Sequence, residues 1–287
     1  MGTLEHTYIE TNGIKLHVVQ QGPEEGELVI LLHGFPEFWY GWSNQMSYLA
    51  AKGFRVWAPD QRGYNLSDKP KKVKDYRMDQ LSADVAGLIK ASGKEKVILV
   101  GHDWGGIVAW RVAREHPDLL HKLIILNAPH EVAMGKQIVQ HPLQLLKSSY
   151  IGFFQLRGIP EKLFGMANWK ACEKALVSSS REGTFSEDDL QKYRVAWSQS
   201  SAMRSMINWY RALVIKSANS SIPVQVTLPT FLIWGAKDQF LGHELASKSL
   251  EFCYNGRGIL LGEATHWVHH EEPERVNKLI LDFIDEE

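Results

Sequence analysis

Short apolar runs alternate with longer amphipathic segments along the first 130 residues of the chain. The runs have the length of buried strands, and they cover residues 14–20, 28–32, 54–58, 96–100 and 122–127. The segments between them repeat apolar residues at helical spacing and predict helices over residues 41–52, 78–91 and 104–115. Strands that alternate with helices form a mostly parallel sheet covered on both faces, so the predicted fold class is α/β.

Residues 132–220 interrupt this alternation. They contain no clear buried strand, many aromatic residues, and apolar spacing typical of helices, as at Leu143 and Leu146. The strand pattern returns at residues 230–235 and again at 258–261. The sequence therefore predicts one α/β core, made of residues 1–131 and 221–287, with an inserted helical cap of residues 132–220.

Composition and charge exclude several classes of partner. Hydrophobic residues make up 44% of the chain and charged residues 23%, which is typical of a globular protein. The net charge is -1, from 32 basic and 33 acidic residues, so no global field attracts nucleic acid or an anionic membrane. The longest apolar runs have five or six residues, too few to span a membrane, and no secretory signal is visible. We therefore expect a cytoplasmic protein with no nucleic-acid or membrane partner, and the sequence allows a homodimer.

The two cysteines indicate neither a stabilising disulfide bond nor a metal site. Cys172 and Cys253 are too few for a disulfide framework and fit no metal-ligand spacing. We expect two ordinary half-buried thiols, no metal and no cofactor.

An acidic residue stands at a sharp turn after the strand predicted at residues 96–100. Small residues lie two positions before and two after it, in Gly101-His102-Asp103-Trp104-Gly105, and a predicted helix follows. This is the nucleophile-elbow pattern, with Asp103 at the position that serine often occupies. The helix N-terminus would stabilise negative charge on Asp103. The alternative is an N-cap aspartate without chemistry, since aspartate is a favoured cap.

Three further strand ends carry groups that suit an acid–base site. Asp238 and His266 each come directly after a predicted strand, which gives the chain order nucleophile, acid, histidine. The backbone N–H groups of Phe35 and Trp104 are placed to form an oxyanion hole. The next residue, Pro36, would aim the Phe35 loop through a cis or a trans bond, which the sequence does not distinguish.

Five motifs show a clear resemblance to a known family. HGFPEFWYGW, DQRGYNLSDKP, GHDWGG, WGAKD and EATHWVHHEEPE resemble those of α/β-hydrolase-fold epoxide hydrolases across nearly the whole chain. The first three also occur in haloalkane dehalogenases. The segments SSYIGFFQ and NWYR resemble the cap segments that carry two tyrosines in epoxide hydrolases, which implies that Tyr150 and Tyr210 face the nucleophile. One departure is Asn65, where relatives have glycine; asparagine tolerates the left-handed conformation, so we expect the turn to form.

The chemistry of a carboxylate nucleophile agrees with this resemblance. A carboxylate that attacks saturated carbon forms an alkyl ester, which water can cleave, whereas serine would form a stable ether. His266, oriented by Asp238, would then act as the general base toward water. Epoxide opening leaves an alkoxide, which phenols with a pKa near 10 can stabilise while they stay protonated. The predicted function is therefore hydrolysis of a small apolar epoxide by water, with Tyr150 and Tyr210 activating the epoxide oxygen.

Two alternatives stay open. A haloalkane dehalogenase would need only N–H donors around the halide; dehalogenases commonly use an asparagine where this chain has Phe35. A non-catalytic small-molecule sensor on the same fold would not need Asp103, Asp238 and His266 together, and it would not need the two tyrosines.

Other side chains are assigned to the surroundings of the site. We expect Phe35, Pro36 and Trp104 to form part of the wall of the substrate pocket. Four histidines are expected either behind the site or at the surface, namely His33, His102, His269 and His270. The cap aromatics would either contact an apolar or aryl substrate or form the core of the cap, and they are Phe153, Phe154, Phe164, Trp169, Trp197 and Trp209.

Overall fold

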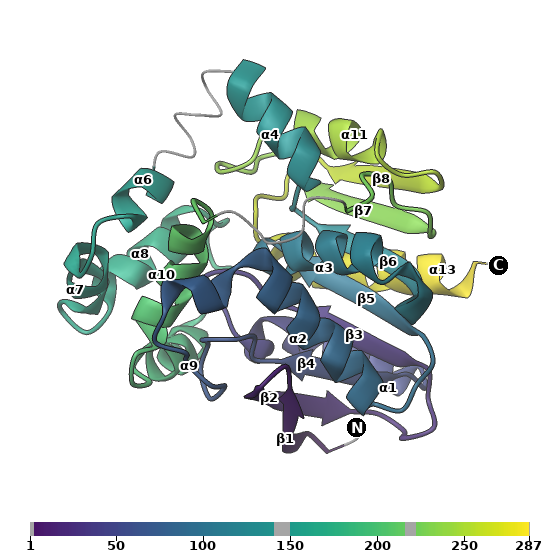
Figure 1. Cartoon of the computed structure of the whole chain (residues 1–287), viewed down its shortest axis with the longest axis horizontal. Coiled ribbons are helices and arrows are strands. Elements are labelled where there is room, and N and C mark those ends of the chain that lie inside the picture. Colours follow the sequence, from purple (N-terminus) through teal and green to yellow (C-terminus); the bar gives the residue numbers. More distant parts are fainter. Residues whose placement is uncertain (1–2, 141–149, 216–221, 287) are drawn as a thin grey trace.

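A single eight-stranded sheet forms the centre of the computed structural model, which describes residues 3–140, 150–215 and 222–286 (Figure 1). The strands follow the spatial order β1-β2-β4-β3-β5-β6-β7-β8. Their bounds are β1 Glu5–Thr11, β2 Ile14–Gln21, β3 Leu28–Leu32, β4 Arg55–Pro59, β5 Val97–His102, β6 Leu120–Leu126, β7 Thr230–Gly235 and β8 Gly256–Leu261.

The sheet is mostly parallel, as the sequence predicts. Strand β2 pairs antiparallel with both β1 and β4, and the remaining neighbours are parallel. The seven predicted strands are all present, with ends shifted by no more than a few residues. Strand β1 was not predicted because it lies at the edge of the sheet, where most of its residues are exposed or half-buried and no apolar run is needed.

Helices cover both faces of the sheet, and their bounds agree with the three predicted for the first part of the chain. The α-helices are α1 Ser43–Ala51, α2 Met78–Ala91, α3 Trp104–Glu115, α4 Glu131–Gln140, α6 Tyr150–Phe154, α7 Ile159–Gly165, α8 Lys170–Ser178, α9 Glu187–Trp197, α10 Ala202–Ala212, α11 Glu244–Leu250, α12 Val268–Glu271 and α13 Pro273–Asp285. Short 3-10 helices span Trp39–Trp42, Val73–Tyr76 and Pro117–Leu119.

Two apolar layers lie against the two faces of the sheet. In β5, Leu99 packs into the layer that contains α2 and α3, whereas Ile98 and Val100 pack into the layer that contains α1 and α13. Successive strand side chains point to opposite faces, so a strand covered on both sides is apolar at every position. This accounts for the continuous apolar runs in the sequence and confirms the α/β fold class.

The helices α6 to α10 gather beside the core on one side of the molecule (Figure 1). Two buried indoles fasten them to core loops: Trp197 Nε1 donates to the Pro36 carbonyl at 2.7 Å, and Trp209 Nε1 donates to the Arg62 carbonyl at 2.9 Å. Within residues 132–220 the described part of the chain contains helices and no strand. Helix α4 packs against the core helix α11, whereas α10 packs against the 3-10 helix Val73–Tyr76 of the core.

Two remaining expectations concern residues 143 and 146 and the membrane. Leu143 and Leu146 lie outside the described residues. None of the helices in the described part of the chain is long and apolar enough to cross a membrane.

Candidate active site

Asp103 occupies a strained turn between β5 and α3. Its backbone has φ 50° and ψ −122°, in a region that side-chain-bearing residues rarely adopt. The turn requires glycine beside it, since a Cβ on Gly105 would lie 2.1 Å from the Leu32 carbonyl oxygen. The sequence pattern of an elbow thus corresponds to a strand-to-helix turn that projects a carboxylate beyond the sheet edge.

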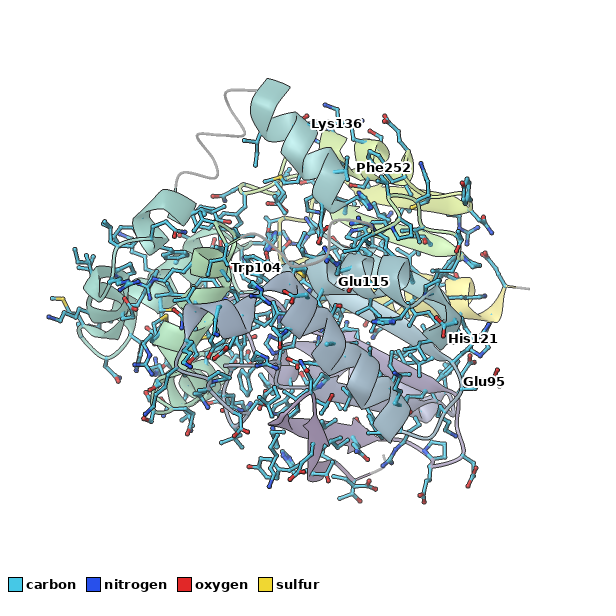
Figure 2. All side chains as sticks on the ribbon, viewed as in Figure 1. Glu95, Trp104, Glu115, His121, Lys136 and Phe252 are labelled. Atoms are coloured by element: carbon cyan, nitrogen blue, oxygen red, sulfur yellow. The ribbon has the colours of Figure 1, made fainter. Side chains whose placement is uncertain are left out.

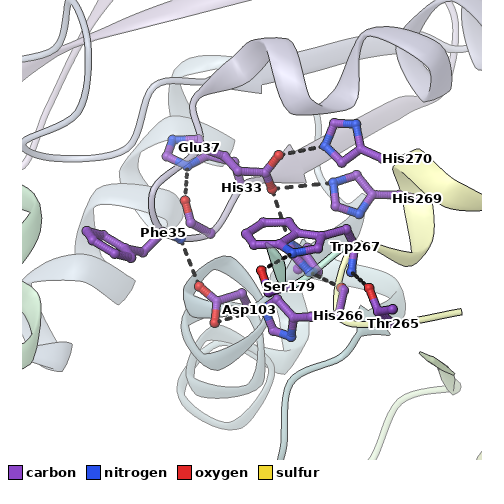
Figure 3. Close-up of polar contacts among 12 residues, drawn as sticks. His33, Phe35, Glu37, Asp103, Ser179, Thr265, His266, Trp267, His269 and His270 are labelled. Carbon is purple, nitrogen blue, oxygen red and sulfur yellow. Dashed lines mark hydrogen bonds and ion pairs between the residues drawn. The ribbon is translucent and has the colours of Figure 1, made fainter. Parts of the chain in front are cut away.

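Two groups hold the Asp103 carboxylate from opposite sides. The Phe35 backbone N–H donates to Oδ1 at 2.8 Å, and His266 Nε2 lies 3.5 Å from Oδ2 (Figure 3). The carboxylate remains 19% exposed. Trp104 opens α3 directly after Asp103, at the end of the helix that faces the cap (Figure 2). Of the two predicted oxyanion donors, the structure describes a hydrogen bond to this carboxylate from Phe35.

Asp238 and His266 form a tight buried pair. His266 Nδ1 donates to Asp238 Oδ2 at 2.7 Å. The other carboxylate oxygen accepts from the backbone N–H groups of Phe240 and Leu241 at 2.8 and 3.0 Å. These contacts fix the orientation of Asp238 and leave His266 Nε2 facing Asp103.

Asn127 completes the set of donors around Asp238, and sequence reasoning missed it. Its Nδ2 donates to Asp238 Oδ2 at 2.7 Å, while its Oδ1 accepts from the Gly235 N–H at 2.9 Å. Asn127 follows β6 directly, so it lies at the same sheet edge as the other site residues. Its position after a buried strand was the signal that could have identified it.

Charge at the site is balanced between one histidine and two carboxylates. Burial alone would lower the pKa of His266, but the charges and hydrogen bonds of Asp238 and Asp103 outweigh it and raise the pKa to about 10. Burial pushes the pKa of Asp238 upward, and the His266 charge and hydrogen bonds reverse this, so the pKa of Asp238 is lowered. At neutral pH the structure therefore favours an imidazolium between two carboxylates.

A cavity of about 530 Å³ opens above Asp103, between the core and the cap helices. Phe35, Pro36 and Trp104 lie in its wall together with Asp103 and His266. The peptide bond between Phe35 and Pro36 is cis.

The cap aromatics divide between the cavity and the packing of the cap. The three that line the cavity are Phe153, Phe154 and Phe164, and the other three lie outside its wall, namely Trp169, Trp197 and Trp209. Cys172 also lines the cavity and is fully buried, which corrects the expectation of a half-buried thiol; Cys253 is half-buried as expected. Burial in this apolar wall raises the pKa of the Cys172 thiol.

Tyr150 and Tyr210 both reach the cavity, from α6 and α10. Their rings meet edge-on with centroids 5.8 Å apart, and the Tyr210 ring lies edge-on to Trp104 at 5.0 Å. Burial raises the pKa of Tyr150, and the charges of Asp103 and Asp238 raise it further. The pKa of Tyr210 is also well above its ordinary value, because of burial first and then the neighbouring Tyr150 and Asp103. Both phenols are therefore protonated donors at neutral pH.

A buried glutamate, which the sequence did not single out, lies behind the site. Glu37 accepts from His270 Nε2 at 2.6 Å (Figure 3). It also accepts from the Tyr193 hydroxyl at 2.8 Å. Its other carboxylate oxygen lies 3.2 Å from His102 Nδ1 and 3.4 Å from His269 Nε2. Burial would raise the pKa of Glu37, but the surrounding histidines hold it well below its ordinary value.

The four histidines therefore lie behind the site and not at the surface. His33, His102 and His269 are fully buried, and His270 is nearly so. His102 Nε2 donates to the His266 carbonyl at 2.8 Å, which links Glu37 to the strand end that carries His266. Glu37, His269 and His270 place ligand atoms within 4.8 Å of one another, a spacing that could hold a metal ion, but Glu37 already accepts two hydrogen bonds there.

The departure at Asn65 is accommodated as expected. Asn65 has φ 35°, and its Nδ2 donates to Asp60 Oδ2 at 2.8 Å. The asparagine therefore forms the turn and also anchors it to a buried carboxylate.

Comparison with known proteins identifies similar sequences and structures. Residues 27–159 match a family described as alpha/beta hydrolase fold. The chain is 48% identical to the AB hydrolase superfamily protein YfhM of Bacillus subtilis, over 96% of each chain. It is 38% identical to human Epoxide hydrolase 4, over 100% of this chain and 80% of that one. An inhibitor complex of a Bacillus megaterium epoxide hydrolase superposes with a TM-score of 0.90 at 30% identity, covering 98% of this chain and 100% of that one.

Proposed function

The chain belongs to the epoxide hydrolases of the α/β-hydrolase fold, and we propose that it converts an apolar epoxide and water into a vicinal diol through an ester on Asp103. The observation that carries the proposal is the placement of one carboxylate between a backbone donor and a histidine, below two protonated phenols.

In the first half-reaction, the Asp103 carboxylate attacks a ring carbon of the epoxide. Oδ1 is held by the Phe35 N–H, so Oδ2 forms the new carbon–oxygen bond. The carbon–oxygen bond of the ring breaks, and its electron pair moves onto the ring oxygen. Tyr150 and Tyr210 donate hydrogen bonds to this developing alkoxide, because their raised pKa values keep both hydroxyls protonated.

The proton of His266 then completes the ring opening. The imidazolium is stabilised by Asp103 as well as by Asp238. Once Asp103 is an ester it carries no charge, so the pKa of His266 falls and the proton passes to the alkoxide. The resulting hydroxyalkyl ester stands beside a neutral imidazole, which can act as a base.

The second half-reaction returns the site to its starting charge. Water attacks the ester carbonyl carbon of Asp103 while His266 Nε2 takes its proton. The Phe35 and Trp104 N–H groups stabilise the oxyanion, and loss of one such donor costs about 3 to 4 kcal/mol in comparable sites. Collapse of the tetrahedral intermediate releases the diol and restores the Asp103 carboxylate beside an imidazolium.

The cavity favours this reaction over the alternatives. Halide release needs N–H donors and no proton, and the Phe35 side chain offers an apolar ring where a second donor would be useful. A sensor would not need the nucleophile, the acid, the base and both phenols together. The aromatic wall and the volume of about 530 Å³ suit apolar alkyl or aryl epoxides. We assign residues 132–220 to the cap; helix α4 forms its base against the core.

A single turnover in heavy-oxygen water with enzyme in excess tests the proposal. We expect one oxygen of the Asp103 carboxylate to appear in the diol and solvent oxygen to appear in Asp103. A diol that carries only solvent label at the new hydroxyl would exclude the ester. As a matched measurement, His266→Gln should form the ester more slowly, because the alkoxide must then take its proton from solvent, and should hydrolyse it more slowly still, because water has lost its base. The ester should therefore accumulate with styrene oxide as substrate and be visible by intact mass; a small chloroalkane in parallel tests the dehalogenase alternative.

A further inference from the structure

A buried arginine joins the two helices that carry the cavity tyrosines. Arg211 follows Tyr210 on α10 and is only 7% exposed. Helix α6, which begins with Tyr150, has five residues and is too short to hold its own position. Its geometry must therefore come from contacts with its neighbours.

The Arg211 guanidinium binds the end of α6 with several of its donors. Nε donates to the Phe154 carbonyl at 2.9 Å, and Nη2 donates to the Leu156 carbonyl at 2.7 Å. Nη1 pairs with Glu161 Oε1 on α7 at 2.6 Å. The Phe154 carbonyl is one of those that a helix end leaves without an intrahelical partner, and Leu156 lies two residues beyond the helix, so the arginine caps α6 from a neighbouring helix.

Gln155 makes the reciprocal connection from α6 to α10. Its Nε2 donates to the Tyr210 carbonyl at 3.0 Å and to the Ile151 carbonyl at 3.4 Å. The backbone of Tyr210 and the side chain of Arg211 thus both bind the segment just after α6, about one helical turn beyond Tyr150.

We propose that Arg211, assisted by Gln155, is a positioning residue that sets the separation of Tyr150 and Tyr210 for ring opening. The inference rests on the proposed epoxide hydrolysis. Two phenols can share one alkoxide only if both hydroxyls reach it, and the ring centroids are already 5.8 Å apart. The planar guanidinium presents its donors in a fixed fork, which a lysine ammonium does not reproduce. Glu161 fixes the orientation of the guanidinium, since its carboxylate accepts hydrogen bonds from both Nη atoms.

We call the contacts of Arg211 with α6 and α7 the clamp. Their position predicts which half-reaction depends on Arg211. The described hydrogen bonds of Arg211 reach the end of α6, helix α7 and its own helix α10, and none of these partners lies at the strand ends that hold Asp103, Asp238 and His266. A small shift of a catalytic group costs rate steeply, about 100-fold for a displacement near 1 Å. Loss of the Arg211 contacts would therefore displace Tyr150 and Tyr210. It would leave Asp238 and His266 in place.

Arg211→Lys tests the clamp, with Arg204→Lys on the exposed face of the same helix as the matched control. Rapid-quench single turnovers with styrene oxide give the rates of ester formation and ester hydrolysis separately. We expect Arg211→Lys to slow ester formation about 10- to 100-fold and to change ester hydrolysis less than about twofold. Gln155→Met removes both hydrogen bonds of Gln155 Nε2 and keeps the chain length, and it should slow ester formation by a smaller factor than Arg211→Lys. This variant tests the inference independently if Arg211→Lys does not fold.

A double-mutant cycle with Tyr210→Phe separates positioning from general damage. If Arg211 acts through the tyrosines, the double variant is slowed much less than the product of the two single effects. Multiplicative effects, an equal loss in both half-reactions, or unchanged ester formation in both Arg211→Lys and Gln155→Met would overturn the inference. Absence of any ester in the wild-type enzyme would instead remove the proposed function itself.

Discussion

Removing the charge of Asp103 is expected to release the proton from His266. The substitution Asp103→Asn keeps the shape of the side chain and imitates the neutral ester. His266 Nε2 lies 3.5 Å from Asp103 Oδ2. With an effective dielectric constant of about 20, two unit charges at this distance interact by about 4.7 kcal/mol, which corresponds to about 3.5 pKa units.

The sign of the shift follows from the groups that face His266. Burial lowers its pKa, whereas Asp238 and Asp103 raise it to about 10. Loss of the Asp103 charge removes one of the two raising carboxylates and leaves Asp238 in place. We therefore expect the pKa of His266 to fall by about 3.5 units in Asp103→Asn.

An NMR titration of ¹⁵N-labelled histidine measures this shift. Intact mass must first show that the amide introduced by Asp103→Asn has not hydrolysed back to a carboxylate. Stability gives a second readout. A histidine with a raised folded pKa stabilises the wild type fully below about pH 6.5, and this contribution is lost as the pH rises toward 10. The free energy of unfolding should therefore change less with pH in Asp103→Asn than in the wild type. If the pKa of His266 stays near 10 in this variant, the Asp103 charge does not hold the proton on His266 and the reasoning is refuted.

Four further substitutions have distinct expected outcomes. Tyr150→Phe and Tyr210→Phe should each slow ester formation at least 10-fold in stopped-flow bursts, and the double variant should nearly abolish it; unchanged bursts would remove the phenols from the mechanism. Gly34→Ala should suppress ester formation about 100-fold with normal circular dichroism, because its Cβ would lie 2.4 Å from the Asp103 Cβ. Asn127→Ala should lower the free energy of unfolding by about 1 to 3 kcal/mol and slow ester hydrolysis more than ester formation, since a buried hydrogen bond to Asp238 is lost. Equal effects on both half-reactions would contradict that assignment.

The three central residues of the site could be predicted because each is marked by the short stretch of sequence around it. Asp103, Asp238 and His266 each lie within five residues of the end of an apolar strand, and in a parallel sheet the carboxyl ends of strands meet at one edge. The same reasoning applied to β6 would have found Asn127, whose amide carries no charge and is therefore less conspicuous in a sequence. The fold class follows from the same runs, because only a doubly covered sheet needs apolar residues on both faces of a strand.

The interactions behind the site could not be read from the sequence in the same way. Glu37 and His270 are 233 positions apart, and their contact depends on how α12 packs beside the loop after β3. A histidine near a glutamate in space leaves no periodic signal in the chain. The cap poses a related problem, since the resemblance implied Tyr150 and Tyr210, but the buried fork of Arg211 that joins their helices follows from tertiary packing alone.

In the proposed mechanism, the two half-reactions depend on different parts of the fold. Ester hydrolysis would depend on strand ends and backbone donors of the core, where Asp238 receives four hydrogen bonds and holds His266. Ring opening would depend in addition on Tyr150 and Tyr210, which lie on cap helices. Substitutions that reshape the cap for another epoxide should therefore change the rate of ester formation more than the rate of its hydrolysis. The steady-state fraction of esterified enzyme, which rises or falls with the ratio of these two rates, reports directly on which part of the fold a substitution has disturbed.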